Sequence, residues 1–180
     1  MNISELLVNG KHLLKDIEDG NIKARILLEY ILKLSREKIV SNPNIEVSDN
    51  NVESYLNKIN DIKNGMPIQY ITNKQEFMKL NFYVDKNVLI PQPDTEILVE
   101  KAIEICNNHG NDIKILDLCT GSGAIGISIA KNIKNAKVYA TDIKNTVIDI
   151  AKQNAKQNNV DNIESVSYTH LRAHETSLHL

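Results

Sequence analysis

Three glycines and two acids in the second half of the chain have the clearest chemical meaning. Gly121, Gly123 and Gly126 form a Gly-x-Gly-x-x-Gly pattern after an apolar run that contains Asp117, and Asp142 lies 21 residues beyond Gly121, after the next apolar run. Glycine allows a backbone to approach a ligand closely, and free N–H groups face that ligand at a helix N-terminus. A carboxylate after the second strand can accept both hydroxyls of a ribose. The pattern therefore predicts a nucleoside-containing cofactor.

Asp117 helps to discriminate between such cofactors. An acid directly before the glycine turn would repel the pyrophosphate of a dinucleotide, whereas it suits a cationic group. S-adenosylmethionine carries an ammonium and a sulfonium, so Asp117 favours this cofactor over NAD.

Residues 1–65 have the apolar periodicity of amphipathic helices. The spacing predicts that these helices pack on one another in a small bundle. Their expected extents are 3–17 with a stop at Gly20, 22–34, a short helix from Ser35 to before Pro43, and one capped by Ser48 or Asp49 that ends at Gly65.

The period changes to two between residues 76 and 90. Apolar side chains alternate from Met78 to Val84, which predicts a half-buried strand, and residues 88–90 offer a partner across a turn at 85–87. Asp94 is the expected N-cap of a helix over 95–106.

Strands and helices alternate after Gly110, which predicts a parallel sheet with right-handed crossovers. Three strands are few for a sheet of this class, so we expect that it is cut short. The expected elements are strands at 113–118, at 137–141 and from Ile163, and helices at 124–131 and 145–158.

The overall composition indicates a soluble globular chain. Its 180 residues are 42% hydrophobic and carry a net charge of −2, which argues against a basic nucleic-acid coat. The chain has two cysteines, no apolar run near the ~20 residues of a membrane span, and no cationic start of a secretory signal. We expect a cytoplasmic protein. His170 and His174 do not match a zinc HExxH pattern because position 178 is Leu, so no metal site is predicted.

The last 17 residues differ in composition from the rest. Residues 1–163 contain 25 Ile, 23 Asn and 18 Lys, whereas residues 164–180 contain none of these and hold three of the five histidines. We interpret residues 165–180 as a non-native tail added by a frameshift or an assembly junction. Resequencing the gene across codon 165 tests this interpretation.

Several segments resemble one family, the HemK-type peptide chain release factor glutamine N5-methyltransferases. The motif DLCTGSGAIGISIA with Asp142 is similar to class I S-adenosylmethionine-dependent methyltransferases in general. Three further segments narrow the resemblance to this family: the joint GMPIQYI (65–71), Glu76-Phe77 and IPQPDTE (90–96). It implies an α/β fold: a small N-terminal helical bundle, a β-hairpin linker, and an incomplete Rossmann-like methyltransferase domain. It also implies that the substrate is the glutamine amide in the Gly-Gly-Gln loop of a release factor.

The family also implies where the cofactor binds. Cys119 to Gly123 would surround the methionine moiety, Asp142 would hold the ribose, and the segment 91–95 would border the pocket. Two positions depart from the family pattern: Cys119 replaces a common Gly, and Gln92 a frequent Arg. The predicted cofactor-binding residues are Asp117, Cys119, Thr120, Gly121, Ser122, Gly123 and Asp142.

The family's Asn-Pro-Pro-Tyr motif is absent, since the only prolines are at 43, 67, 91 and 93. An amide nitrogen is a poor nucleophile, and in the family this motif accepts its N–H bonds and aims it at the methyl carbon. No catalytic residue is therefore predicted, and we expect these 180 residues alone to be inactive.

The expected organisation is a substrate-recognition domain at 1–73, a linker at 74–93 and a partial cofactor-binding domain at 94–164. Two alternatives remain: an adenine N6 DNA or RNA methyltransferase, which uses a similar motif but needs clustered basic residues, and a non-catalytic cofactor-binding fragment.

Overall fold

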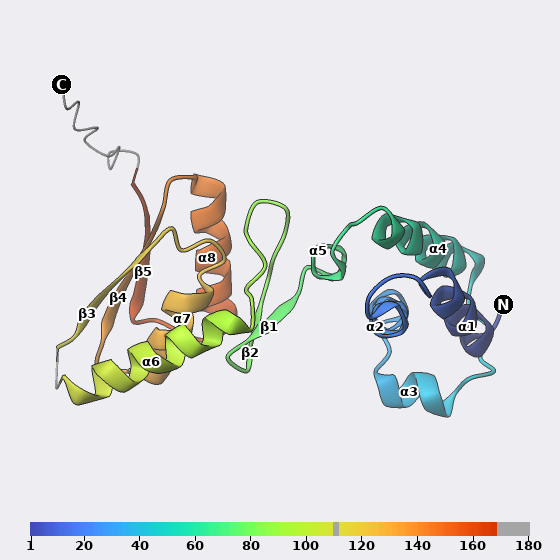
Figure 1. Cartoon of the computed structure of the whole chain (residues 1–180), viewed down its shortest axis with the longest axis horizontal. Helices are drawn as coiled ribbons and strands as arrows, with labels where there is room; N and C mark the ends of the chain where they lie inside the picture. The colour runs from blue at the N-terminus through green and yellow to red at the C-terminus, as the bar shows by residue number, and fades with distance from the viewer. Residues whose placement is uncertain (110–111, 169–180) are drawn as a thin grey trace, which may run out of the picture. The chain divides into compact units, whose positions relative to one another are not determined.

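The computed structural model describes residues 1–109 and 112–168, which form two compact units: Met1–Thr72, and a second that begins at Asn73 (Figure 1). His170, His174 and most of the tail, about which predictions were made from the sequence, lie outside the described residues. Among the described residues, no helix has both the length and the apolar character that crossing a membrane requires.

The first unit consists of five helices, and its apolar periodicity predicted the first four. Tyr55 of α4, Leu6 of α1 and Leu28 of α2 are fully buried in its core. The helices are α1 (Ile3–Leu13), α2 (Gly20–Leu32), α3 (Arg36–Ser41), α4 (Asp49–Lys63) and α5 (Ile68–Thr72). The short α5 was not predicted.

The first helix ends earlier than predicted, and Gly20 begins the second helix instead of ending the first. The chain turns between them, with Ile17 N–H donating to Leu14 O and Gly20 N–H donating to Ile17 O. A Cβ on Gly20 would lie 2.0 Å from Leu14 O, so this turn requires glycine.

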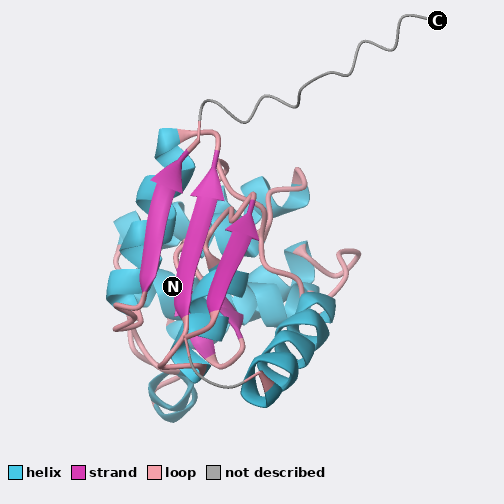
Figure 2. Cartoon of the chain, turned by 90° about the vertical axis from the view of Figure 1, so that its left-hand side faces the viewer, coloured by secondary structure: helices cyan, strands magenta, loops and turns pink. Residues whose placement is uncertain are grey.

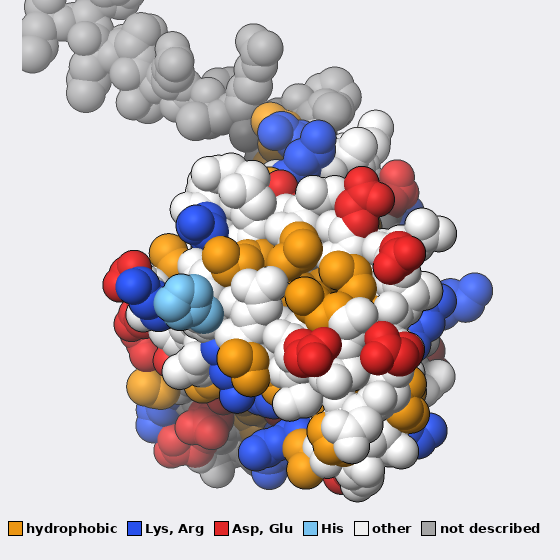
Figure 3. Space-filling model, turned by 90° about the vertical axis from the view of Figure 1, so that its right-hand side faces the viewer, with side chains coloured by type: hydrophobic (Ala, Val, Ile, Leu, Met, Phe, Trp, Pro, Cys, Tyr) orange, Lys and Arg blue, Asp and Glu red, His pale blue; other side chains and the backbone are white. Residues whose placement is uncertain are grey.

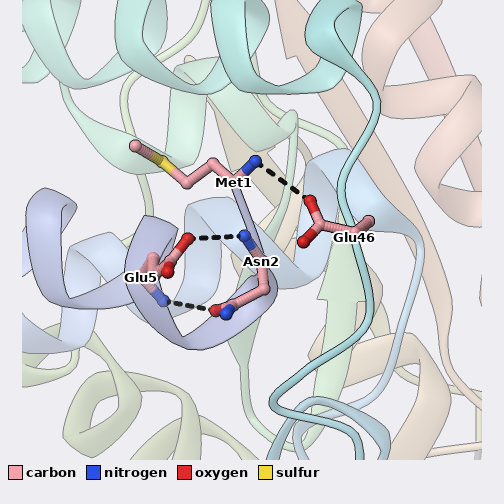
Figure 4. A network of polar contacts seen from close by, with 4 residues as sticks. All are labelled: Met1, Asn2, Glu5 and Glu46. Carbon is pink, nitrogen blue, oxygen red and sulfur yellow. Dashed lines mark hydrogen bonds and ion pairs between the residues drawn. The ribbon is translucent and has the colours of Figure 1, made fainter.

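The start of α1 is held by polar contacts among Met1, Asn2, Glu5 and Glu46 (Figure 4). Asn2 Oδ1 accepts from Glu5 N–H and Glu5 Oε2 accepts from Asn2 N–H, both at 2.9 Å, which is a capping box. The amino group of Met1 donates to Glu46 Oε2 at 3.1 Å, and this hydrogen bond raises the pKa of the amino group. The segment before α4 is thereby tied to the first helix.

Apolar side chains are scattered among polar and charged ones on the face drawn in Figure 3. The large apolar side chains exposed in this unit are Met1, Val8, Leu13, Ile22, Tyr30, Val40, Ile45 and Met66.

The second unit begins with a hairpin whose predicted position was wrong. Strands β1 (Gln75–Phe77) and β2 (Leu80–Phe82) pair antiparallel, with Phe77 opposite Leu80, so the turn is Met78-Lys79 and residues 88–90 are not a strand. Both turn residues have positive φ (50° and 60°), as in a type I′ turn. The buried rings of Phe77 and Phe82 pack edge to face, with 6.2 Å between their centroids and an angle of 74° between their planes. This contact fixes the register.

Three parallel strands follow in the order β3 (Lys114–Leu118), β4 (Lys137–Asp142) and β5 (Ile163–Ser167), as predicted (Figure 2). Helices α7 (Ala124–Asn132) and α8 (Asn145–Gln157) connect them. Helix α6 (Asp94–Asn108) packs against α7. Its N-cap is Pro93, so the prediction that Asp94 caps it was wrong; Asp94 is its first residue, where an acid still favours the helix dipole.

Residues 165–167, predicted to belong to a foreign tail, are the last three of β5. Ser165 lies opposite Ala140 and Ser167 opposite Asp142. Residues 165–167 therefore complete the pairing of β5 with β4 up to Asp142.

The two faces of the sheet have different surroundings. Helices α7 and α8 pack on the face that buries Val138 and Ala140. On the other face, Leu116 is 59% and Leu118 54% exposed. Parallel sheets are usually covered on both faces, so this apolar surface is unusual for the class.

Ser128 of α7 offers a stability prediction. Its side chain is fully buried, and its hydroxyl has no hydrogen-bond partner among the described residues. We expect Ser128→Ala to raise the free energy of unfolding by about 1 kcal/mol, because it removes an unsatisfied buried hydroxyl and favours the helix. Urea unfolding measures this change. Ser54→Ala, at an exposed position of α4, is the control for helix propensity alone; a loss of stability in Ser128→Ala would contradict the prediction.

Candidate functional site

The glycine loop, residues 119–123, connects β3 to α7 at the carboxyl edge of the sheet. Thr120 N–H donates to Thr141 O of the neighbouring strand, and Gly123 N–H donates to Thr120 O, both at 2.9 Å. Gly121 and Gly123 have positive φ (56° and 82°). A Cβ on Gly121 would meet nothing within 4 Å, so the backbone has open space beside it. A ligand can therefore approach this backbone closely.

Asp117, near the end of β3, stabilises the loop through two hydrogen bonds. Its Oδ2 atom accepts from the Thr120 hydroxyl at 2.7 Å and from Gly126 N–H at 3.0 Å. Burial raises the pKa of this carboxyl, the two hydrogen bonds lower it in part, and the nearby Asp142 raises it further. A Cβ on Gly126 would lie 2.8 Å from Asp117 Oδ2, which explains why the third position of the pattern is glycine.

Asp142 ends β4 beside the loop. Its Oδ2 atom accepts from Gly121 N–H at 3.1 Å, and its Oδ1 atom accepts from Ile143 N–H at 2.8 Å. The register pairs Leu118 with Thr141, so both acids lie near the carboxyl ends of adjacent strands. The structure therefore brings together the two acids and the glycines that the sequence singled out.

A cavity of about 160 Å³ opens between the loop and the segment that precedes α6. The predicted Cys119, Thr120, Gly121 and Ser122 line it, whereas Asp117, Gly123 and Asp142 are not part of its wall. Its other lining residues are Phe77, Leu89, Ile90, Pro91, Gln92, Thr95, Ala124 and Ile125. The segment 91–95, predicted to border the pocket, contributes three of them.

A larger, shallower depression of about 800 Å³ runs along α8 and β5 from Lys152 to Ser165. It contains no residue of the glycine loop and neither acid. Because this depression is shallow and lies away from the glycine loop and both acids, the smaller cavity is the better candidate site.

Asn154 contacts the glycine loop but was not among the residues predicted from the sequence. It is fully buried in α8, and its amide bonds to the backbone of Ser122 and of Tyr83. The available signal was its spacing: Val147, Ile150 and Asn154 lie on the same buried face of the helix, where an amide requires internal partners.

Cys119 adopts the left-handed conformation, with φ of 60°. This conformation costs a side-chain-bearing residue more than it costs glycine. We expect Cys119→Gly to stabilise the second unit by about 0.5–1 kcal/mol relative to Cys119→Ala, because both remove the thiol and only glycine relieves the strain. Urea unfolding of the two variants checks this. Equal stabilities would contradict it.

Two family models match consecutive parts of the chain. Residues 5–72 match the PrmC N-terminal domain, and residues 68–178 match a family described as lysine methyltransferase. Release factor glutamine methyltransferases from Clostridium acetobutylicum and Clostridium botulinum are 43% and 40% identical over 163 and 162 residues, which is 89% of this chain in each case. The chain belongs to the release factor glutamine methyltransferase family.

The chain spans 57% of the length of both clostridial relatives. The corresponding enzyme of Borreliella burgdorferi is 37% identical over 171 residues, 95% of this chain and 58% of that protein.

Two solved structures have partial similarity to the chain. The Pyrococcus abyssi tRNA (uracil-54, C5)-methyltransferase in complex with S-adenosyl-L-homocysteine is 26% identical, with a TM-score of 0.43, covering 53% of this chain and 23% of that one. TYW2 of M. jannaschii in complex with AdoMet is 20% identical, with a TM-score of 0.44, covering 52% and 42%.

Proposed function

We propose that residues 73–168 bind S-adenosylmethionine as part of a methyltransferase that modifies the glutamine side-chain amide of a peptide chain release factor. The observation that carries the proposal is the glycine loop together with Asp142 at the end of the adjacent strand. Gly121 leaves open space beside its backbone, and the Asp142 carboxylate lies at the same edge, where it can accept ribose hydroxyls.

The residues present fit this cofactor. The loop wall of the cavity, Cys119 to Ser122, would face the methionine moiety, and Asp142 would hold the ribose. The cavity is smaller than the ~300 Å³ of a usual ligand pocket, so it would enclose part of the ligand and leave the rest over the open carboxyl edge. S-adenosylmethionine supplies the methyl group. Asp117 would act by holding the loop through Thr120 and Gly126, and its carboxylate would add favourable charge for a cation.

The helical unit would recognise the release factor. The support is the match of residues 5–72 to the N-terminal domain of this family, together with the names of the clostridial relatives. A lysine acceptor is the second candidate, because the family matched by residues 68–178 is described as lysine methyltransferase. The N-terminal match favours glutamine.

Isothermal titration calorimetry with S-adenosylhomocysteine tests the cofactor. We expect saturable one-to-one binding and none with NAD; the absence of binding at saturating ligand would refute the proposal.

Incubation with radiolabelled S-adenosylmethionine and a release factor tests the reaction. We expect the 180 residues to transfer no label, because they lack the Asn-Pro-Pro-Tyr acceptors of the substrate amide. Label on either residue would refute this inactivity, and label on lysine would in addition favour the second candidate.

A further inference from the structure

Asn154 joins two segments that are distant in sequence: the glycine loop, which lines the cavity, and Tyr83, which follows β2. Its Nδ2 atom donates to Ser122 O at 2.8 Å and to Tyr83 O at 3.0 Å, and its Oδ1 atom accepts from Tyr83 N–H at 2.7 Å. One buried amide thus pairs with both backbone groups of Tyr83, as a neighbouring strand would, and holds the glycine loop with its remaining hydrogen.

Both partners are connected to the cavity wall, Ser122 as a lining residue and Tyr83 through the chain that follows it. Ser122 lines the cavity itself. Tyr83 follows β2 and is continuous with residues 84–88, where Val84 and Val88 are buried, and then with the lining residues Leu89 to Gln92. A shift of either backbone would therefore change the width of the cavity.

The burial of Asn154 makes this arrangement specific. The side chain has no exposed surface, and its donors and its acceptor all have partners, so another arrangement of either segment would leave a polar group buried without one. By contrast, Gln157 and Asn158 of the same region donate to Asn81 O of the hairpin, at 3.0 and 2.9 Å. Gln157 is exposed, and Asn158, which also donates to Asn154 O at 2.9 Å, is half-buried. They tie α8 to the hairpin without reaching the loop.

We propose that Asn154 is a positioning residue for cofactor binding, which sets the distance between the glycine loop and the segment 89–92 by bonding to Ser122 and Tyr83 at once. This inference rests on the proposed function for its ligand. It assigns Asn154 no contact with the cofactor, and its effect acts through the two backbones.

The test compares four variants of the full 180-residue chain. Asn154→Ala removes all three bonds, and Asn154→Asp keeps the shape and the acceptor for Tyr83 N–H but loses the donors. Gln157→Ala removes a hydrogen bond to the hairpin alone. Val138→Ala weakens the core at the opposite end of β4, and so controls for lost stability.

Affinity for S-adenosylhomocysteine is measured by calorimetry well below the unfolding midpoint of each variant. We expect at least a tenfold loss of affinity in both Asn154 variants and less than a twofold change in Gln157→Ala and Val138→Ala. Unchanged affinity in the Asn154 variants, or an equal loss in Val138→Ala, would overturn the proposal. A loss in Asn154→Ala alone would also overturn it, because the bond to Ser122 would then be dispensable.

Amide hydrogen exchange of the free proteins separates this inference from the proposed function. The amides of Thr120, Gly121 and Gly123 are hydrogen-bonded within the site, so their exchange reports opening of the loop. If the unsubstituted chain binds no S-adenosylhomocysteine, the proposed function fails and exchange decides the role of Asn154. Exchange of these amides at least tenfold faster in Asn154→Ala than in Val138→Ala supports positioning, and equal exchange overturns it.

Discussion

Replacement of Asp142 by alanine is expected to weaken binding of S-adenosylhomocysteine by about a hundredfold. The carboxylate would accept two ribose hydroxyls, and hydrogen bonds to a charged group contribute about 1.5–3 kcal/mol each, so the loss of two amounts to about 3 kcal/mol or more. The substitution also removes the acceptor of Gly121 N–H, which holds the loop at 3.1 Å. Calorimetric titration of the variant and the unsubstituted chain measures the change.

Two further variants make this result interpretable. Asp149→Asn removes an exposed acid from α8, seven residues after Asp142, and controls for a change in net charge. Asp142→Asn keeps the shape and one acceptor oxygen, so we expect an intermediate loss of about tenfold. An Asp142→Ala variant that binds as tightly as the Asp149→Asn control would show that Asp142 does not hold the ligand.

Gly10→Ala is expected to destabilise the helical unit by about 3 kcal/mol. A Cβ on Gly10 would lie 1.9 Å from the Tyr55 hydroxyl oxygen and 2.7 Å from Cζ of the same ring. Tyr55 cannot move away easily, because it is fully buried and its hydroxyl donates to Ala24 O at 3.0 Å. Overpacking of this kind forces side chains or helices apart. Urea unfolding followed by circular dichroism measures the loss.

Tyr55→Phe tests the physical cause through a double-mutant cycle. Alone it removes the hydrogen bond to Ala24 O, and we expect a loss of about 1–2 kcal/mol. In the Tyr55→Phe background Gly10→Ala should cost clearly less, because the closest clashing atom is gone, although the ring carbons remain near. Strictly additive losses would contradict a clash between Gly10 and Tyr55.

The main elements of the fold could be predicted because their apolar residues keep one spacing over long stretches and because glycine or proline marks many of their ends. The parallel strand–helix alternation and the glycine loop between Asp117 and Gly126 follow from local sequence, and the structure has them. The helices of residues 1–65 were predicted for the same reason, although the end of the first was misplaced because its stripe continues to Ile17.

The hairpin could not be placed from the sequence, because its turn contains none of the residues that usually form turns, such as Gly, Asn or Asp. Methionine and lysine rarely adopt positive φ, and the alternation of apolar residues continues through positions 78 and 79. Tertiary contacts determine this turn: Phe77 packs on Phe82, and Met78 N–H donates to Glu96 Oε1 at 2.6 Å. Neither contact can be read from the local pattern.

The candidate site was predicted in part. The loop and Asp142 follow from residue types at strand ends, but the bracing role of Asp117 depends on which way its side chain turns. Asn154 was missed because its partners are 71 and 32 residues away in sequence. A polar residue on an apolar helix face marks such a position without naming its partners.

The different contact patterns of the two units have a consequence for how fast each half forms. The helical unit makes its core from short segments joined by brief turns, whereas the sheet pairs strands only after each crossover helix has been traversed. Chains rich in local contacts fold faster than those that depend on distant pairing, and domains form in order as they leave the ribosome. During synthesis the helical unit is therefore native before the strands that carry Asp117 and Asp142 have met.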